Sequence, residues 1–134
     1  MRLAALVLSA CFLSASAATA QAIPAAFQGS WKGTGSQSDE PGVEWTIALT
    51  LAGGARESVV GTITYPSLEC GGDLILREAE PGRVELLERI TFGSCVDRGV
   101  VTLTPSRGGL AFDWRGENDL TARGVLTRAQ PPAP

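Results

Sequence analysis

The sequence predicts an all-β domain, an eight-stranded antiparallel up-and-down β-barrel that carries one disulfide. Three observations predict this class. Apolar residues recur at every second position in one segment after another, which is typical of half-buried strands. Turn residues separate these segments at short intervals, and no stretch combines helical period with helical length. Eight strands with short connections pair in chain order, and closing them into a barrel removes both sheet edges.

Residues 1–22 precede the predicted domain and have the pattern of a secretory signal peptide. A short basic start is followed by an apolar core, Leu3–Leu13, and by small residues with A-x-A patterns that end at Ala20 and Ala22. The segment is too short and wrongly flanked for a membrane span. We therefore expect a secreted or periplasmic protein, cleaved after Ala20 or after Ala22.

A lipoprotein signal is the alternative interpretation of this segment. The sequence Leu8-Ser9-Ala10-Cys11 resembles the lipobox of bacterial lipoproteins, in which the cysteine becomes the lipidated first residue. The apolar run before Cys11 is short, however, and the residues after it are still apolar rather than polar. Ordinary secretion is favoured, with Cys11 as an apolar residue of the signal core.

The predicted barrel domain covers residues 23–128, and a proline-rich tail, predicted to be disordered, covers residues 129–134. Each predicted strand is a run of alternating or β-branched residues that ends at glycine, proline or polar turn residues. The predicted strands are 31–36, 43–52, 59–65, 73–80, 83–92, 98–105, 109–115 and 120–128.

Alternation assigns a face to the residues of several predicted strands. The second strand places four apolar residues on one face, Trp45, Ile47, Leu49 and Leu51. The third strand places Val59, Gly61, Ile63 and Tyr65 on one face and ends at Pro66, which cannot donate to the sheet ladder. The fourth and fifth strands form a hairpin through Pro81-Gly82. The fifth strand sends Val84, Leu86, Glu88 and Ile90 to one face.

Two cysteines, Cys70 and Cys95, remain after removal of the signal peptide, and an even pair in an exported domain predicts one disulfide. In an up-and-down barrel the loops that carry them lie at the same end, as a disulfide requires. Closing this loop stabilises the fold by roughly 3–4 kcal/mol in the chain-entropy model. We expect no metal, because the chain has no histidine and no further cysteine to complete a ligand set.

The first predicted strand opens with Gly29 and Trp31, a G-x-W pair. This start resembles the calycin barrels, the lipocalin, fatty-acid-binding and avidin groups. The resemblance implies that Trp31 plugs one end of the barrel and that an arginine of the last strand stacks on it. Arg123 or Arg128 fills that role, and we take Arg123 as the first candidate. The alternative is an ordinary first strand with a core tryptophan.

A second resemblance covers residues 61–104. The sequence Tyr65-Pro66-Ser67-Leu68, followed by Cys70-Gly71-Gly72 and by E-R-I-T before Cys95, resembles a small extracytoplasmic domain of bacterial secreted proteins and sensor kinases. It implies fold and compartment only.

The charge of the chain argues against two classes of partner. The whole chain has a net charge of −3, and the predicted mature chain, without Arg2, has a net charge of −4. Nucleic acids and anionic membrane surfaces are bound through basic patches. We therefore expect neither as a partner. A small molecule or another protein is the expected partner, and the oligomeric state is left open.

Catalysis is not predicted. The absence of histidine removes the commonest general base, and a disulfide takes Cys70 out of consideration as a nucleophile. The carboxylates Glu44, Glu69, Glu88 and Asp97 show no spacing that singles out a catalytic pair. We predict no catalytic residue and no cofactor, and an uncharacterised carboxylate-based hydrolase is the last alternative.

Glu88 is the most informative polar residue, because it shares a predicted inward face with apolar neighbours, and a buried carboxylate needs a partner. The favoured interpretation pairs it with an arginine near the strand end; the other makes it the polar anchor of a ligand pocket with Trp45, Phe112 and Trp114. We expect a largely filled barrel with binding at its mouth. The leading function is non-catalytic binding of a small apolar ligand. The alternative is a protein-binding or inhibitor module that acts through the loops.

Overall fold

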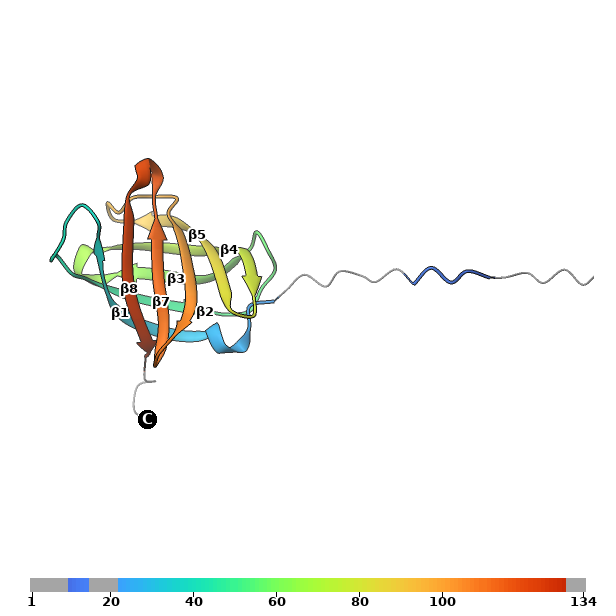
Figure 1. Cartoon of the computed structure of the whole chain (residues 1–134). Helices are drawn as coiled ribbons and strands as arrows, with labels where there is room; N and C mark the ends of the chain where they lie inside the picture. The colour runs from blue at the N-terminus through green and yellow to red at the C-terminus, as the bar shows by residue number, and fades with distance from the viewer. Residues whose placement is uncertain (1–9, 15–21, 130–134) are drawn as a thin grey trace, which may run out of the picture.

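The computed structural model describes residues 10–14 and 22–129, in which eight strands form one closed antiparallel barrel. Neighbours in the chain are neighbours in the sheet, and the last strand pairs with the first (Figure 1). The strands are β1 (Gly29–Gln37), β2 (Trp45–Leu51), β3 (Val59–Tyr65), β4 (Cys70–Glu80), β5 (Arg83–Phe92), β6 (Val100–Ser106), β7 (Gly109–Arg115) and β8 (Thr121–Arg128). Three single-turn helices accompany them: η1 (Ala25–Phe27), η2 (Pro66–Leu68) and η3 (Glu117–Asp119).

The predicted up-and-down barrel is confirmed, and so is the Cys70–Cys95 disulfide, whose Cα atoms are 5.8 Å apart. The largest boundary difference is at β4, which begins at Cys70 rather than at residue 73. Gly71 and Gly72 continue the ladder there by pairing with Thr64 and Ile63 of β3. The disulfide thus joins the first residue of β4 to the loop between β5 and β6.

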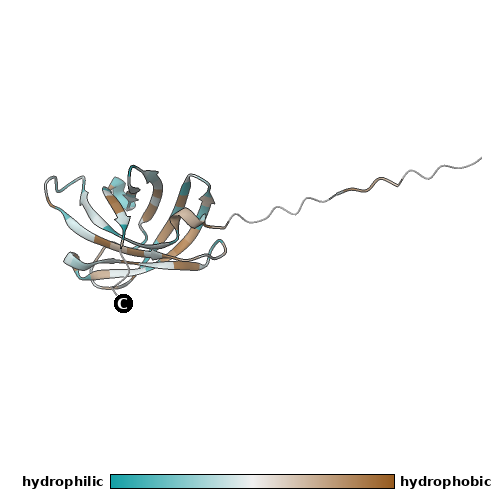
Figure 2. Cartoon of the chain, turned by 90° about the horizontal axis from the view of Figure 1, so that it is seen from below, coloured by the Kyte–Doolittle hydropathy of each residue, from teal (hydrophilic) through white to brown (hydrophobic). Residues whose placement is uncertain are grey.

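Alternation along the strands produces one core inside the barrel. Apolar and polar stretches follow one another along the ribbons in Figure 2. On β2, Trp45, Ile47, Leu49 and Leu51 are all buried, as predicted. Burial of these inward faces is the main stabilising contribution, about 25 cal/mol for each Å² of apolar surface removed from water.

The predicted face of the third strand is wrong at its start. The β3–β4 register shifts between Val59 and Gly61, as it does at a β-bulge, so successive residues there do not simply alternate. Val60 is buried, and Val59 is 50% exposed. From Ile63 to Tyr65 the strand has the predicted inward face.

The two ends of the barrel differ, and we call them the closed end and the open end. The closed end carries η1, the start of β1 and the end of β8. The open end carries the β1–β2, β3–β4, β5–β6 and β7–β8 connections. In Figure 1 the β7–β8 connection lies at the top of the barrel, and β8 runs down to the opposite end.

Helix η1 and Trp31 fill the closed end. Ile23, Phe27 and Trp31 are at most 4% exposed, and the indole N–H of Trp31 donates to the carbonyl of Phe27 at 3.0 Å. The guanidinium of Arg128 stacks 4.4 Å from the centre of the Trp31 ring. It also donates to the carbonyls of Gln28 (2.8 Å) and Ala26 (3.1 Å).

The choice of Arg123 as the arginine that stacks on Trp31 is wrong. Arg128 is the direct register partner of Trp31, and paired residues lie on the same face of a sheet. Arg123 lies an odd number of residues away from Arg128 and therefore points outward. Its side chain is 88% exposed and forms an ion pair with Asp113 at 3.3 Å.

Most of the predicted signal peptide (1–9 and 15–21) and of the predicted tail (130–134) lies outside the described residues. Cys11, within the described segment 10–14, is exposed and free. No helix in residues 10–14 and 22–129 is long and apolar enough to cross a membrane.

Candidate functional site

A pocket of about 280 Å³ lies inside the open end of the barrel, and we call it the mouth pocket. Six strands, η2 and the β5–β6 loop contribute to it. Its lining is mainly aromatic and aliphatic, with one carboxyl group: Gln37, Trp45, Tyr65, Leu68, Glu88, Ser94, Cys95, Val96, Trp114 and Ala122. Of the predicted ligand-binding residues, the structure brings together Glu88, Trp45 and Trp114.

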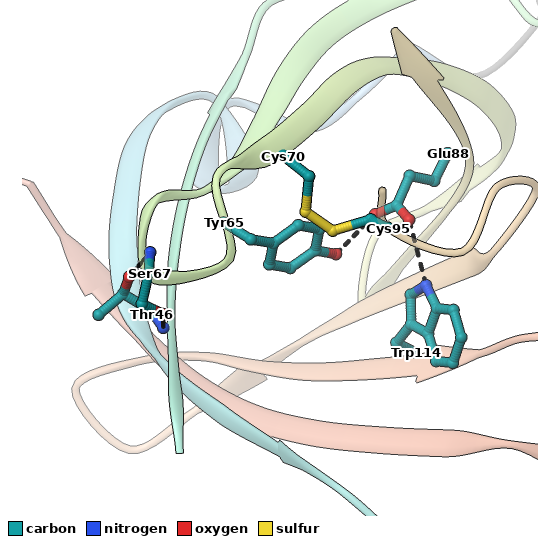
Figure 3. Close-up of a disulfide and its surroundings, with 7 residues drawn as sticks. All are labelled: Thr46, Tyr65, Ser67, Cys70, Glu88, Cys95 and Trp114. Carbon is teal, nitrogen blue, oxygen red and sulfur yellow. Dashed lines mark hydrogen bonds between the residues drawn. A yellow bond between two sulfur atoms is a disulfide. The ribbon is translucent and has the colours of Figure 1, made fainter. Parts of the chain in front are cut away.

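The carboxyl group of Glu88 is the polar centre of the mouth pocket. Only 1% of the residue is exposed to solvent. The hydroxyl of Tyr65 donates to Oε2 at 2.6 Å, and the indole N–H of Trp114 donates to Oε1 at 3.3 Å. Figure 3 shows both side chains directed at this carboxyl, each from a different direction.

The predicted arginine partner of Glu88 is wrong. The ion pairs within residues 10–14 and 22–129 use other carboxylates, those of Asp73, Glu78, Glu85 and Asp113. No lysine or arginine lines the mouth pocket in the described part of the chain. The physical reason is position: the arginines near this end of β5 lie outside the barrel, and Arg89 pairs there with Asp73 at 2.7 Å.

Burial changes the acidity of both ionisable groups in the pocket. Desolvation raises the pKa of Glu88 from its usual 4.5 to about 7, although the hydrogen bonds from Tyr65 and Trp114 act in the opposite direction. The pKa of Tyr65 is raised well above its usual value, first by burial and then by the charge of Glu88. Near neutral pH the Tyr65 hydroxyl therefore stays protonated, and the Glu88 carboxyl is present in both its protonated and its ionised form.

Two glycines position Trp114. A Cβ atom added to Gly99 or to Gly116 would overlap the indole ring, so the backbone can approach both sides of the ring only where a side chain is absent. Gly99 also accepts a backbone hydrogen bond from Glu88, at 2.8 Å. The same loop residue thus holds the strand that carries Glu88 and the ring that donates to it.

The β5–β6 loop forms one wall of the pocket through Ser94, Cys95 and Val96. The disulfide fixes it to β4, and Asp97 fixes its far side. The Asp97 carboxylate accepts from the backbone N–H groups of Ile90 and Arg98, both at 2.9 Å. These hydrogen bonds lower the pKa of Asp97, so the group stays ionised near neutral pH.

Helix η2 forms another part of the wall through Leu68. A reciprocal pair of hydrogen bonds fixes this helix to β2: the Thr46 N–H donates to the Ser67 hydroxyl at 2.9 Å, and the Ser67 N–H donates to the Thr46 hydroxyl oxygen at 3.0 Å. Figure 3 shows this pair beside Tyr65. Leu68 is 47% exposed, so it forms part of the rim as well as the wall.

Phe112 does not line the mouth pocket, contrary to prediction. It is 1% exposed and lies two residues deeper along β7 than Trp114. Three other residues also lie two positions deeper along their strands than a pocket residue: Ile47 below Trp45, Ile63 below Tyr65, and Leu86 below Glu88. Each of the three is at most 1% exposed. These four residues form the apolar layer beneath the pocket, which leaves the mouth as the accessible part of the interior.

Sequence reasoning missed Tyr65 as a site residue, together with the wall residues Leu68 and Val96. Tyr65 had an available signal, because it lies on the predicted inward face just before Pro66. It pairs with Glu88 across the barrel interior, between strands that are not neighbours in the sheet.

In the described part of the chain, no group of three or more histidine, cysteine, aspartate or glutamate side chains is placed to hold a metal ion. No family model matches this chain, and no curated protein or solved structure matches it either.

Proposed function

We propose that this protein is an extracytoplasmic, non-catalytic binding protein that takes a small, mainly apolar ligand in the mouth pocket. The observation that carries the proposal is the combination of an aromatic pocket with a single buried carboxyl group at the open end. Ligand sites are typically apolar hollows with a few polar groups that fix orientation. At about 280 Å³ the pocket is near the lower end of their size range.

The compartment is supported by the disulfide. Such bonds form and persist in oxidising environments, so the Cys70–Cys95 bond fits an extracytoplasmic protein. Secretion through residues 1–22 remains a prediction. The resemblance to the calycin barrels also remains a prediction, and the stacking of Arg128 on Trp31 is an arrangement that it implies.

Binding of phenethyl alcohol, a small aromatic compound with one hydroxyl, tests the proposal. We expect one saturable site by titration calorimetry. Ala122→Leu, which adds volume inside the pocket, should weaken this binding at least tenfold. Val125→Leu is the matched control, because Val125 is on the same strand but 57% exposed on the outer surface. Equal binding by both variants, with both folded by circular dichroism, would contradict a site in the mouth pocket.

A protein-binding or inhibitor module is the second candidate, and exposed apolar residues around the open end favour it. Val43, Leu68 and Val96 lie on three of the connections at this end, and Phe92 is the last residue of β5. Each of these four residues is 47–53% exposed. The double variant Leu68→Ser/Val96→Ser tests this function. Loss of a stable complex with a purified extracytoplasmic partner would support it, provided that Val125→Ser leaves the complex intact.

A further inference from the structure

The mouth pocket contains a negative charge for which the described part of the chain supplies no counter-charge. Among residues 10–14 and 22–129, Glu88 is the only carboxylate that lines the pocket, and no basic side chain lines the pocket or forms an ion pair with Glu88. An ionised carboxylate away from water is costly unless it is paired. A ligand that brought a positive charge would supply the missing partner.

Glu88 also has unused capacity to accept hydrogen bonds. A carboxylate offers about four acceptor sites on its two oxygens. The Tyr65 hydroxyl and the Trp114 indole N–H occupy one site on each oxygen. The remaining sites suit a donor-only group, and an ammonium is a donor-only group.

The rings around Glu88 suit a cation as well. Trp45 and Tyr65 meet edge to face, with centroids 5.3 Å apart and planes at 88°. Together with Trp114 they place three aromatic rings in the lining of one small pocket. Aromatic faces attract cations, and this attraction is larger where water is excluded.

We propose that the mouth pocket binds a small organic cation, an apolar ammonium whose charge is balanced by Glu88 and whose body lies among Trp45, Tyr65 and Trp114. This inference rests on the proposed function and specifies its ligand class. A neutral ligand leaves the carboxylate unpaired, and an anionic ligand is repelled by it.

The protonation state of Glu88 controls this recognition. Two titratable groups act on Glu88: Tyr65 from β3 through its hydrogen bond, and Asp97 from the β5–β6 loop through its charge. Near neutral pH, Tyr65 is neutral, and Asp97 carries a negative charge that also favours a cation. Because the pKa of Glu88 is about 7, a cation must displace a proton from it in mildly acidic solution.

Three probes of similar size test the proposal: phenethylamine, phenethyl alcohol and phenylacetate, titrated into the full mature chain at about pH 8 by calorimetry. We expect the ammonium to bind at least tenfold more tightly than the alcohol, and phenylacetate not to bind. Glu88→Gln should reduce the affinity for the ammonium at least tenfold and leave the affinity for the alcohol within about twofold. Glu44→Gln, at the same end but outside the pocket lining, should change neither.

A pH series on the unmodified protein keeps the proposal testable if Glu88→Gln does not fold. Phenyltrimethylammonium has a permanent charge, so only the protein titrates. Because the pKa of Glu88 is about 7, the affinity of the protein for phenyltrimethylammonium should be roughly tenfold lower at about pH 6 than at about pH 8. Equal affinities at the two pH values would overturn the role of Glu88.

The outcomes separate the two proposals. If phenethyl alcohol binds as tightly as phenethylamine, the cation proposal fails and the binding function stands. If phenylacetate binds best, the charge argument is wrong as well. If none of the three probes binds, both proposals fail.

Discussion

The two ends of the barrel contain the same kinds of group in opposite arrangements. At the closed end, the indole N–H of Trp31 donates to a backbone carbonyl, and its ring is covered by the cation of Arg128. At the open end, the indole N–H of Trp114 donates to the side chain of Glu88, a buried and titratable anion. One tryptophan therefore completes a plug, and the other lines a pocket.

This difference shows how a small barrel separates stability from binding. At the closed end, helix η1 supplies carbonyls to Trp31 and Arg128, so the chain satisfies its own polar groups there. At the open end, the acceptor is a carboxyl group that burial destabilises in its charged form. Sites that bind are often less stable than the fold allows, and we expect substitutions at the two ends to have different consequences.

The largest expected effect is at the plug. Trp31→Ala should lower the free energy of unfolding by roughly 3–5 kcal/mol, the usual loss when a large aromatic is removed from a core. Urea denaturation followed by circular dichroism measures it. A loss below about 1 kcal/mol would show that the closed end does not depend on Trp31.

Removing the disulfide should cost slightly less and should act at the other end. The bond closes a loop across a sequence separation of 25 residues, so Cys70→Ala/Cys95→Ala should destabilise by roughly 3–4 kcal/mol. Denaturation of the double variant measures this loss. The disulfide holds the Cys95–Val96 wall of the pocket, so the folded double variant should also bind phenethylamine more weakly. An unchanged affinity for phenethylamine would contradict the proposed difference between the two ends.

Glu88 should make stability depend on pH. Its pKa is about 7 in the folded protein against 4.5 ordinarily, so between these values the folded state binds more protons than the unfolded state. The free energy of unfolding should therefore fall as pH rises from 4.5 to 7, by about 3 kcal/mol, and this contribution should be constant above pH 7. Denaturation of wild type across this range measures the fall.

Glu88→Gln is the decisive variant for this pH dependence, and Glu44→Gln is its control. The first should remove the fall, because an uncharged side chain has no desolvation cost that changes with pH. The second should keep it. A profile unaltered by Glu88→Gln would assign the pH dependence to another group.

The smallest expected effect compares the two arginines of β8. Arg128→Ala should cost about 1 kcal/mol, through the lost stacking on Trp31 and the lost hydrogen bonds to η1. Arg123→Ala should change stability by less than about 0.5 kcal/mol, because it removes a surface ion pair. Equal losses would contradict a specific role for Arg128.

Most of the fold could be predicted from the sequence, because alternation and turn residues are local signals. Alternation could also have predicted the face of Arg128. Arg128 lies two residues after the buried Leu126 and so shares its face, whereas Arg123 lies three residues before Leu126 and points to the other face. The bulge that turns Val59 outward left no comparable pattern in the sequence.

The candidate site was harder to predict because its contacts cross the barrel. Period two placed Glu88 inside, but the partners Tyr65 and Trp114 are on strands that do not neighbour β5. No pairing rule in the sheet connects them. Phe112 and Trp114 share a face and a residue class, and only their depth in the barrel separates core from pocket.

The contrast between the two ends is tested most directly by the indole N–H signals of the three tryptophans in an NMR titration of isotope-labelled protein. Phenethylamine should shift the signals of Trp45 and Trp114 in a saturable way and leave that of Trp31, at the closed end, in place. A shift of Trp31 as large as that of Trp114, or no shift in any of the three at saturating probe, would contradict the account.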